Sequence, residues 1–157
     1  MNLFTENPDL TFVARMVLAA ILSFVIGWER ESRGSPAGDR TYALVGLGSA
    51  AFTAVGVDAF PATAEKLIAG VVTGVGFLGA GMILKEGQQV IGLTTAAAIW
   101  AVAAVGVVVG AGEYFVGVTL AVVILVVLES DRLPFLSRLE ASNVMRRRGE
   151  TAGRKDT

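Results

Sequence analysis

The fold is decided by the stretch Leu67-Ile-Ala-Gly70-Val-Val-Thr-Gly74-Val-Gly76-Phe-Leu-Gly79-Ala-Gly81-Met-Ile-Leu84. On a helix, at about 100° per residue, Gly70, Gly74 and Gly81 share one face, and Gly76 and Gly79 lie nearly opposite. Small residues let helix backbones approach closely in lipid, where packing rather than the hydrophobic effect drives association. We therefore expect these five glycines to be packing surfaces of a central helix with neighbours on two sides.

Four other apolar runs surround this one, at residues 12–28, 41–57, 93–109 and 114–128. The five runs have 15–18 residues each, at or below the lower edge of the ~17–25 that cross a bilayer. The last run is short enough to be a re-entrant or tilted segment instead. The chain is 54% hydrophobic with a mean hydropathy of +0.64, too apolar for a typical soluble domain. The predicted fold class is all-α: a polytopic transmembrane bundle of about five short spans with a glycine-rich central hairpin.

Two patterns inside the runs have a structural interpretation. Gly74-Val-Gly76-Phe-Leu-Gly79 matches the dinucleotide-binding G-x-G-x-x-G pattern, but that pattern requires a preceding strand and a later acidic residue. An apolar helix surrounds it here, so we interpret it as helix packing. In the second run a polar stripe recurs at helical spacing and should face other helices; it consists of Tyr42, Ser49, Thr53 and Gly56.

The basic residues predict the orientation. With five crossings, residues 29–40, residues 85–92 and the tail share one side, which carries every Lys and Arg outside the spans except Lys66. Positive charge accumulates on the cytoplasmic side of a membrane. The N-terminus is therefore expected outside and the C-terminus in the cytoplasm. Residues 1–128 would form the transmembrane domain, and 129–157, with seven Lys/Arg against five Asp/Glu, a basic, partly disordered cytoplasmic tail attracted to anionic lipid.

Several classes of chemistry are excluded by composition. The chain has no Cys and no His, which removes thiol nucleophiles, disulfides, imidazole bases and the usual zinc ligands. No nucleophile–base pair is recognisable. We expect no enzyme, no catalytic residue and no nucleic-acid partner; the expected partners are the lipid bilayer and either further copies of the chain or another membrane protein.

One group of charges is expected to meet at the cytoplasmic face. Charges that abut helix ends are costly unless paired, and opposite signs in equal number suggest a salt-bridge network. Its members would be Glu29, Arg30, Asp39, Arg40, Lys85 and Glu86, with Thr94 and Thr95 nearby. Asp39 is also a plausible N-cap. Glu31 and Arg33 are interpreted as solvated charges.

A second group of charges is expected at the opposite face. Asp58, Glu65 and Glu113 are opposed there by Lys66. These carboxylates are candidates for holding a hydrated magnesium ion, which needs few protein ligands; the alternative is that they are merely solvated. Apart from this ion, no cofactor is expected. Arg15, one turn inside the first run, should snorkel outward or pair with a carboxylate such as Glu113.

Three ordered blocks carry a family resemblance. They are Gly27-Trp28-Glu29-Arg30-Glu31 followed by Ala37-Gly38-Asp39-Arg40-Thr41; Gly74 to Gly81 with Lys85-Glu86-Gly87; and Gly92-Leu93-Thr94-Thr95-Ala96-Ala97-Ala98-Ile99-Trp100. Together they resemble the MgtC/SapB family of bacterial inner-membrane proteins over residues 12–128.

The resemblance implies a regulatory role in growth under magnesium limitation, through a membrane partner such as the rotary ATP synthase. Glu86 matches an acidic position that the family uses. Thr94 and Ala101 stand where well-known members have asparagine and cysteine, and Asp39 replaces an apolar residue. The alternative function is a magnesium transporter or channel, working as a single chain or as an oligomer.

Overall fold

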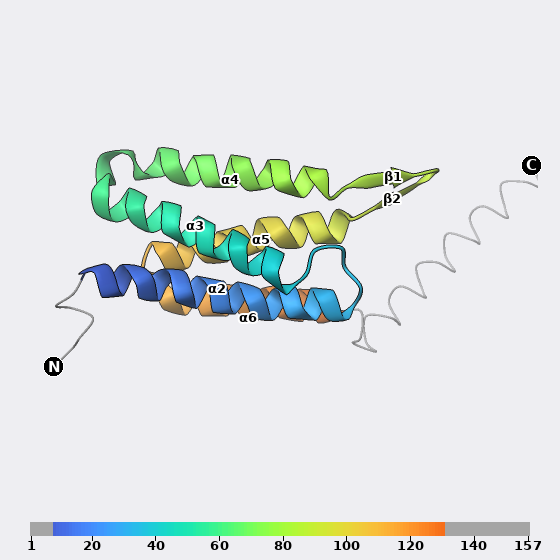
Figure 1. Cartoon of the computed structure of the whole chain (residues 1–157), viewed down its shortest axis with the longest axis horizontal. Helices are drawn as coiled ribbons and strands as arrows, with labels where there is room; N and C mark the ends of the chain where they lie inside the picture. The colour runs from blue at the N-terminus through green and yellow to red at the C-terminus, as the bar shows by residue number, and fades with distance from the viewer. Residues whose placement is uncertain (1–7, 131–157) are drawn as a thin grey trace, which may run out of the picture. The chain divides into compact units, whose positions relative to one another are not determined.

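The computed structural model describes residues 8–130, and these residues are almost entirely helical (Figure 1). The long helices are α2 (Pro8–Ser32), α3 (Asp39–Ala59), α4 (Ala64–Gly81), α5 (Leu93–Gly110) and α6 (Tyr114–Glu129). A 3-10 turn, η1 (Pro61–Thr63), precedes α4, and two short strands, β1 (Leu84–Glu86) and β2 (Gln89–Ile91), connect α4 to α5. The predicted all-α class is confirmed. Residues 131–157, most of the predicted basic tail, lie outside the described part.

Four of these helices are long and apolar enough to cross a membrane: α2, α3, α4 with η1, and α5. Helix α6 is apolar but has 16 residues, which agrees with the fifth run being the shortest. Successive helices from α2 to α5 run in opposite directions along the bundle (Figure 1). This alternation brings residues 33–38 and the β1–β2 hairpin to one end of the bundle and η1 to the other.

The centre of the bundle is formed by α3 and α5, not by the glycine-rich α4. Helix α3 packs most extensively on α2 and then on α5, and α5 also contacts α2 and α4. In α5, 56% of the spanning window is buried, against 17% for the window that contains α4. Helix α4 buries a single stripe, Val71, Val75 and Gly79. The expectation that the other helices pack around α4 is therefore wrong.

The glycines that bring the helices together are mostly not those predicted. A Cβ at Gly27 of α2 would lie 2.7 Å from the Asp39 Cα. A Cβ at Gly46 of α3 would overlap Ser23, and one at Gly106 of α5 would overlap the Gly46 carbonyl oxygen. Gly110 faces the Ala50 backbone in the same way. These four positions set the close approach of α3 to both α2 and α5.

The glycines of α4 behave differently from one another. Gly79 does meet a neighbour, since a Cβ there would lie 3.3 Å from the Ala96 carbonyl oxygen of α5. No atom of a neighbouring residue between 8 and 130 lies within 4 Å of a Cβ placed at the other four, Gly70, Gly74, Gly76 and Gly81. Within one chain these four are not packing positions. Packing against another molecule stays a prediction for them.

The expected polar turn between α4 and α5 is a β-hairpin. Leu84 pairs with Ile91, Lys85 with Val90 and Glu86 with Gln89, which leaves Gly87 and Gln88 at the turn. Gly87 has a φ of +61°, a conformation that glycine adopts without penalty and that tight hairpin turns require. Both strands are exposed along their whole length. The hairpin extends beyond the ends of α4 and α5 (Figure 1).

Candidate functional site

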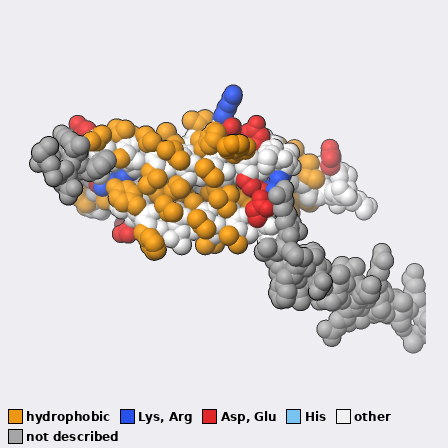
Figure 2. All heavy atoms as spheres, turned by 90° about the horizontal axis from the view of Figure 1, so that it is seen from below, with side chains coloured by type: hydrophobic (Ala, Val, Ile, Leu, Met, Phe, Trp, Pro, Cys, Tyr) orange, Lys and Arg blue, Asp and Glu red, His pale blue; other side chains and the backbone are white. Residues whose placement is uncertain are grey.

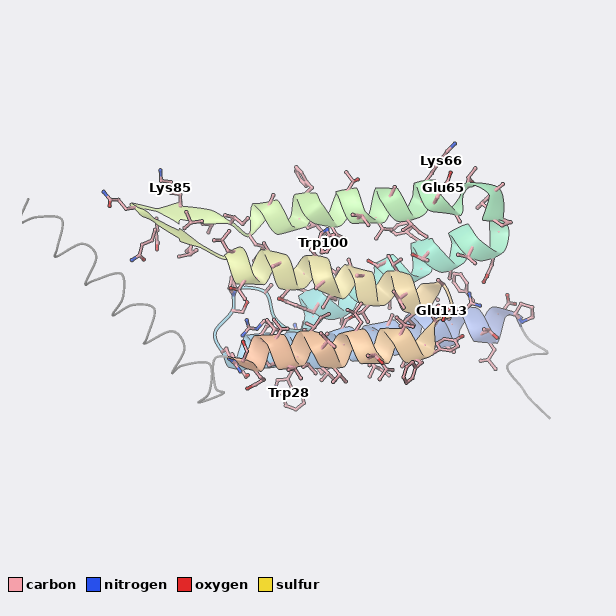
Figure 3. The ribbon with its side chains drawn as sticks, turned by 180° about the vertical axis from the view of Figure 1, so that it is seen from behind. Trp28, Glu65, Lys66, Lys85, Trp100 and Glu113 are labelled. Carbon is pink, nitrogen blue, oxygen red and sulfur yellow. The ribbon has the colours of Figure 1, made fainter. Side chains whose placement is uncertain are left out.

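Charged side chains gather at two ends of the bundle, with a broad apolar band between them (Figure 2). We call them the Glu29 end, with Glu29, Arg30, Glu31, Arg33, Asp39, Arg40, Lys85 and Glu86, and the Asp58 end, with Arg15, Asp58, Glu65, Lys66 and Glu113. Figure 3 shows Glu65 and Lys66 where α4 begins, and Lys85 far away on the hairpin that follows it. The apolar band matches the hydrocarbon region of a bilayer, so the two ends lie at opposite interfaces.

Glu29 is the centre of an ion-pair cluster at the Glu29 end. Its carboxylate accepts hydrogen bonds from Arg30, from Nε at 2.7 Å and from Nη2 at 3.2 Å. Arg33, four residues later and directly after the end of α2, forms a second ion pair with it. The side chains of Glu29 and Arg30 are each only 10% exposed. Arg33 is thus not the solvated charge we expected, because one helical turn places it on the same face as Glu29.

Asp39 is held by Glu31 and by the Arg40 backbone N–H, which donates to its carboxylate, and no ion pair joins it to the Arg30 or Arg40 guanidinium among the described residues. The Glu31 carboxylate accepts the backbone N–H of Asp39 at 3.0 Å. A carboxylate is favourable at a helix N-terminus, where N–H groups lack partners. The predicted N-cap was Asp39, but the residue in the cap position is Gly38, whose side chain can supply no oxygen. Glu31, expected to be solvated, provides that oxygen from α2.

The expected single network is therefore divided. The Glu29 cluster lies at the C-terminal end of α2 and on Arg33 just after it. The Glu31–Asp39 contact ties α2 to α3 beside an open polar pocket of about 480 Å³ lined by both carboxylates and by Arg40. Thr95 is buried and shares a hydrogen bond of 3.1 Å with Ser35. Thr94 is exposed on the first turn of α5, and Glu86 is exposed on the hairpin.

Arg15 joins three helices at the Asp58 end. Its Nη1 donates to both Asp58 carboxylate oxygens, at 3.1 and 3.2 Å, and to the Gly110 carbonyl oxygen at 3.2 Å. It therefore pairs with a carboxylate, as one alternative predicted, but with Asp58 rather than Glu113. A charged group inside the apolar run is stabilised in this way by a partner and by a free helix C-terminal carbonyl.

The three proposed magnesium ligands do not form a cluster. Between residues 8 and 130, no three acidic, His or Cys side chains lie close enough to hold a metal ion. Asp58 is engaged by Arg15. Glu65 lies on the first turn of α4 and Glu113 on the turn before α6 (Figure 3). We grouped these three carboxylates only because the predicted spans put them at the same end of the bundle. A shared end does not fix the distances between side chains on different helices.

Hydroxyl groups line the interior between the two ends. Tyr42, Ser49 and Thr53 of α3 are buried, as the polar stripe predicted. Ser23 of α2 is buried too, and its side chain lies where a Cβ at Gly46 of α3 would be. The oxygens of Ser23, Tyr42 and Thr53 have no hydrogen-bond partner among the described residues. Buried hydroxyls usually find a partner or an ordered water, so this interior is more polar than the outward surfaces of the helices.

Sequence comparison now gives the family. The model of the MgtC family matches residues 16–133, which includes the Glu29 end, the Asp58 end apart from Arg15, and all four long spans apart from the first turns of α2. The chain belongs to the MgtC family. The predicted resemblance is therefore confirmed.

The relatives are longer than this MgtC-family chain. The Escherichia coli K12 protein named "Putative magnesium transporter YhiD" is 46% identical over 127 residues, covering 75% of this chain and 59% of the relative. Protein MgtC of Salmonella typhimurium LT2 is 41% identical over 103 residues, covering 66% and 45%. An uncharacterised Haemophilus influenzae protein is 39% identical over 154 residues, covering 90% and 64%. The chain thus spans less than two thirds of these relatives, and no solved structure matches it.

Family membership and the apolar helices together establish a multi-pass membrane protein. Sequence reasoning located both charged ends but not the four glycines at the α2–α3 and α3–α5 interfaces. A signal for two of them was present, because Gly106 and Gly110 are four residues apart, the small-xxx-small spacing of close helix pairs in membranes.

Proposed function

We propose that this protein is a non-enzymatic regulator of magnesium homeostasis in the bacterial inner membrane, acting by contact with another membrane protein. The MgtC family match and the name of YhiD support the connection with magnesium. The rotary ATP synthase is the partner suggested by the resemblance. The Glu29 end would face the cytoplasm, since Arg30, Arg33, Arg40 and Lys85 gather there.

The observation that carries this proposal is the lack of acidic groups between the two ends. No Asp or Glu lies within the apolar parts of the described spans, from 16 to 28, 41 to 57, 67 to 84, 93 to 110 and 114 to 128. Ion pathways through membranes usually contain ionisable residues that face the interior. Acids at both ends are paired with arginines: the nearly buried Glu29 with Arg30 and Arg33, and the exposed Asp58 with Arg15.

The β1–β2 hairpin is the part best placed to contact a partner. It extends beyond the helices, and Lys85 and Glu86 are exposed on β1 (Figure 1). The hairpin also exposes apolar surface, with Val90 51% and Ile91 42% exposed. An isolated two-stranded hairpin has little stability of its own. A partner that covers the hairpin would bury its apolar side chains and stabilise its conformation.

Growth at low magnesium tests the regulatory role. In a bacterium whose own MgtC-family gene is deleted, the wild-type chain should restore growth. We expect the Glu86→Ala variant to lower growth to near that of cells without the protein. Glu65→Ala is the matched control, an exposed acid at the Asp58 end, and should grow like wild type. Equal growth of both variants, at equal protein levels in the membrane, would contradict the proposal.

The second candidate function is magnesium transport. The name of YhiD favours it, and so does the interior row of hydroxyls, with Ser23, Tyr42 and Thr53 left without protein partners among the described residues. Such oxygens are weak ligands compared with the carboxylates that magnesium prefers. We therefore rank transport below regulation.

A further inference from the structure

A long apolar groove runs between α3 and α4 on the outside of the bundle. Its volume is about 610 Å³, within the range of about 300–1,000 Å³ typical of ligand sites. Val71 and Val75 of α4 and Ser49 of α3 are its buried residues. Leu44, Phe52 and Leu78 line it as well and remain largely exposed.

Three glycines create this groove. Gly48 of α3 and Gly70 and Gly74 of α4 all line it. A Cβ at any of the three would have no neighbour within 4 Å in the part of the chain that the structure describes. The missing side chains therefore leave room for an outside molecule to lie against both backbones. This gives Gly70 and Gly74 a different role from the helix packing that their spacing predicted.

The dimensions and the charge of the groove indicate what fills it. Along α4 the lining residues extend from Lys66 to Leu78, which is about 18 Å at the helical rise of about 1.5 Å per residue. Half of the hydrocarbon core of a bilayer is about 15 Å. Lys66, the basic residue of the lining, is exposed at the interface on the first turn of α4 (Figure 3).

We propose that the groove between α3 and α4 binds one phospholipid, with an acyl chain along Gly48, Gly70 and Gly74 and its phosphate on Lys66. The lipid comes from the leaflet at the Asp58 end. Lys66 presents an ammonium group at the depth of the phosphates while its stem follows the apolar wall. The proposal does not depend on the regulatory function.

A transmembrane helix of a second copy fits this groove less well. Such a helix would cross the whole hydrocarbon core, about 30 Å, whereas the lining reaches through about one leaflet. A helix that docks by apolar contact also has no use for the ammonium group at one end. An acyl chain with a phosphate headgroup matches both features.

Lipid retention measured by native mass spectrometry tests this assignment. The protein is reconstituted into vesicles of phosphatidylethanolamine and phosphatidylglycerol and then released in a mild detergent. We expect wild type to retain one phospholipid per chain. Gly74→Leu should lose it, because the leucine fills the groove, and Gly48→Leu provides an independent variant on the opposite wall. Gly76→Leu is the matched control, since Gly76 lies on the same helix, is equally open and does not line the groove.

Lys66 provides a second measurement. Loss of one basic contact at a membrane surface should weaken retention about five-fold, so Lys66→Gln should release the lipid more readily than Lys66→Arg. Lys85→Gln, at the far end of α4, should leave retention unchanged. The proposal is overturned if wild type carries no lipid, if Gly74→Leu and Gly48→Leu retain as much as Gly76→Leu, or if these variants split an oligomer without changing the bound lipid.

Discussion

Ser23 occupies the space that a side chain at Gly46 would need, and this contact shows how the bundle is held at the residue scale. Gly106 approaches the backbone of Gly46 from the opposite side. Gly46 is therefore enclosed by α2 and α5 at once. Glycine at such positions contributes through the closeness that it permits rather than through a contact of its own.

Replacing a glycine by leucine should destabilise the protein where the glycine contacts another helix and should have little effect where the glycine is open. Gly46→Leu and Gly106→Leu should each lower stability by at least roughly 1–3 kcal/mol, the usual cost of overpacking, and reduce accumulation in the membrane. Gly76→Leu should behave like wild type, because no neighbour among the described residues lies within 4 Å of its Cβ position. Thermal unfolding in detergent and membrane protein levels measure both effects. If Gly76→Leu is the most damaging variant, the assignment of the packing surfaces is wrong.

At the scale of elements, the sequence predicted well where the apolar helices lie along the chain, but it predicted poorly which helices pack against one another. Run length and hydropathy follow from the need to cross hydrocarbon, so the helices appear near their expected places. Glycine content predicted α4 as the centre, yet glycines at Gly70 and Gly74 leave a groove instead of a contact. A helix that is apolar all round, such as α5, gives no sign of whether it faces protein or lipid.

The same limit applies to the charged ends. The predicted spans placed Glu29, Arg30 and Asp39 at one end correctly. The choice of partner depends on helix rotation, which put Arg33 beside Glu29 and Glu31 beside the N-terminus of α3. Arg15 pairs with Asp58 for the same reason, at a sequence separation of 43 residues. Sequence spacing predicts contacts along one helix but not between helices.

The connections between helices allow the orientation to be tested. The chain has no cysteine, so a single introduced cysteine is the only thiol in the protein that a maleimide can label. We expect Glu113→Cys to react with a membrane-impermeant maleimide added to intact cells whose outer membrane is permeable. Gln88→Cys, at the hairpin turn, should react only after the inner membrane is opened, because the basic residues predict that this end faces the cytoplasm. If Gln88→Cys is labelled in intact cells and Glu113→Cys is not, the orientation of the chain is the opposite of the predicted one.

At the scale of the whole molecule, the bundle is a family domain with paired charges at both ends and a hydroxyl-lined interior. A transporter must offer binding groups along one path and release its ion on the far side. Asp58 and Glu29 lie at opposite ends, and the apolar parts of the described spans between them contain no carboxylate. Helix carbonyls are normally satisfied by their own helix. These features favour action through contact over action through transport.

Magnesium flux into liposomes tests this central claim most directly. Purified protein is reconstituted into vesicles with a trapped magnesium-sensitive dye, and correct folding is checked by its helical circular dichroism signal. We expect no uptake above that of protein-free vesicles, for wild type and for the Asp58→Asn variant alike. Robust uptake by wild type that disappears in Asp58→Asn would contradict the proposed regulatory role and identify the protein as a transporter.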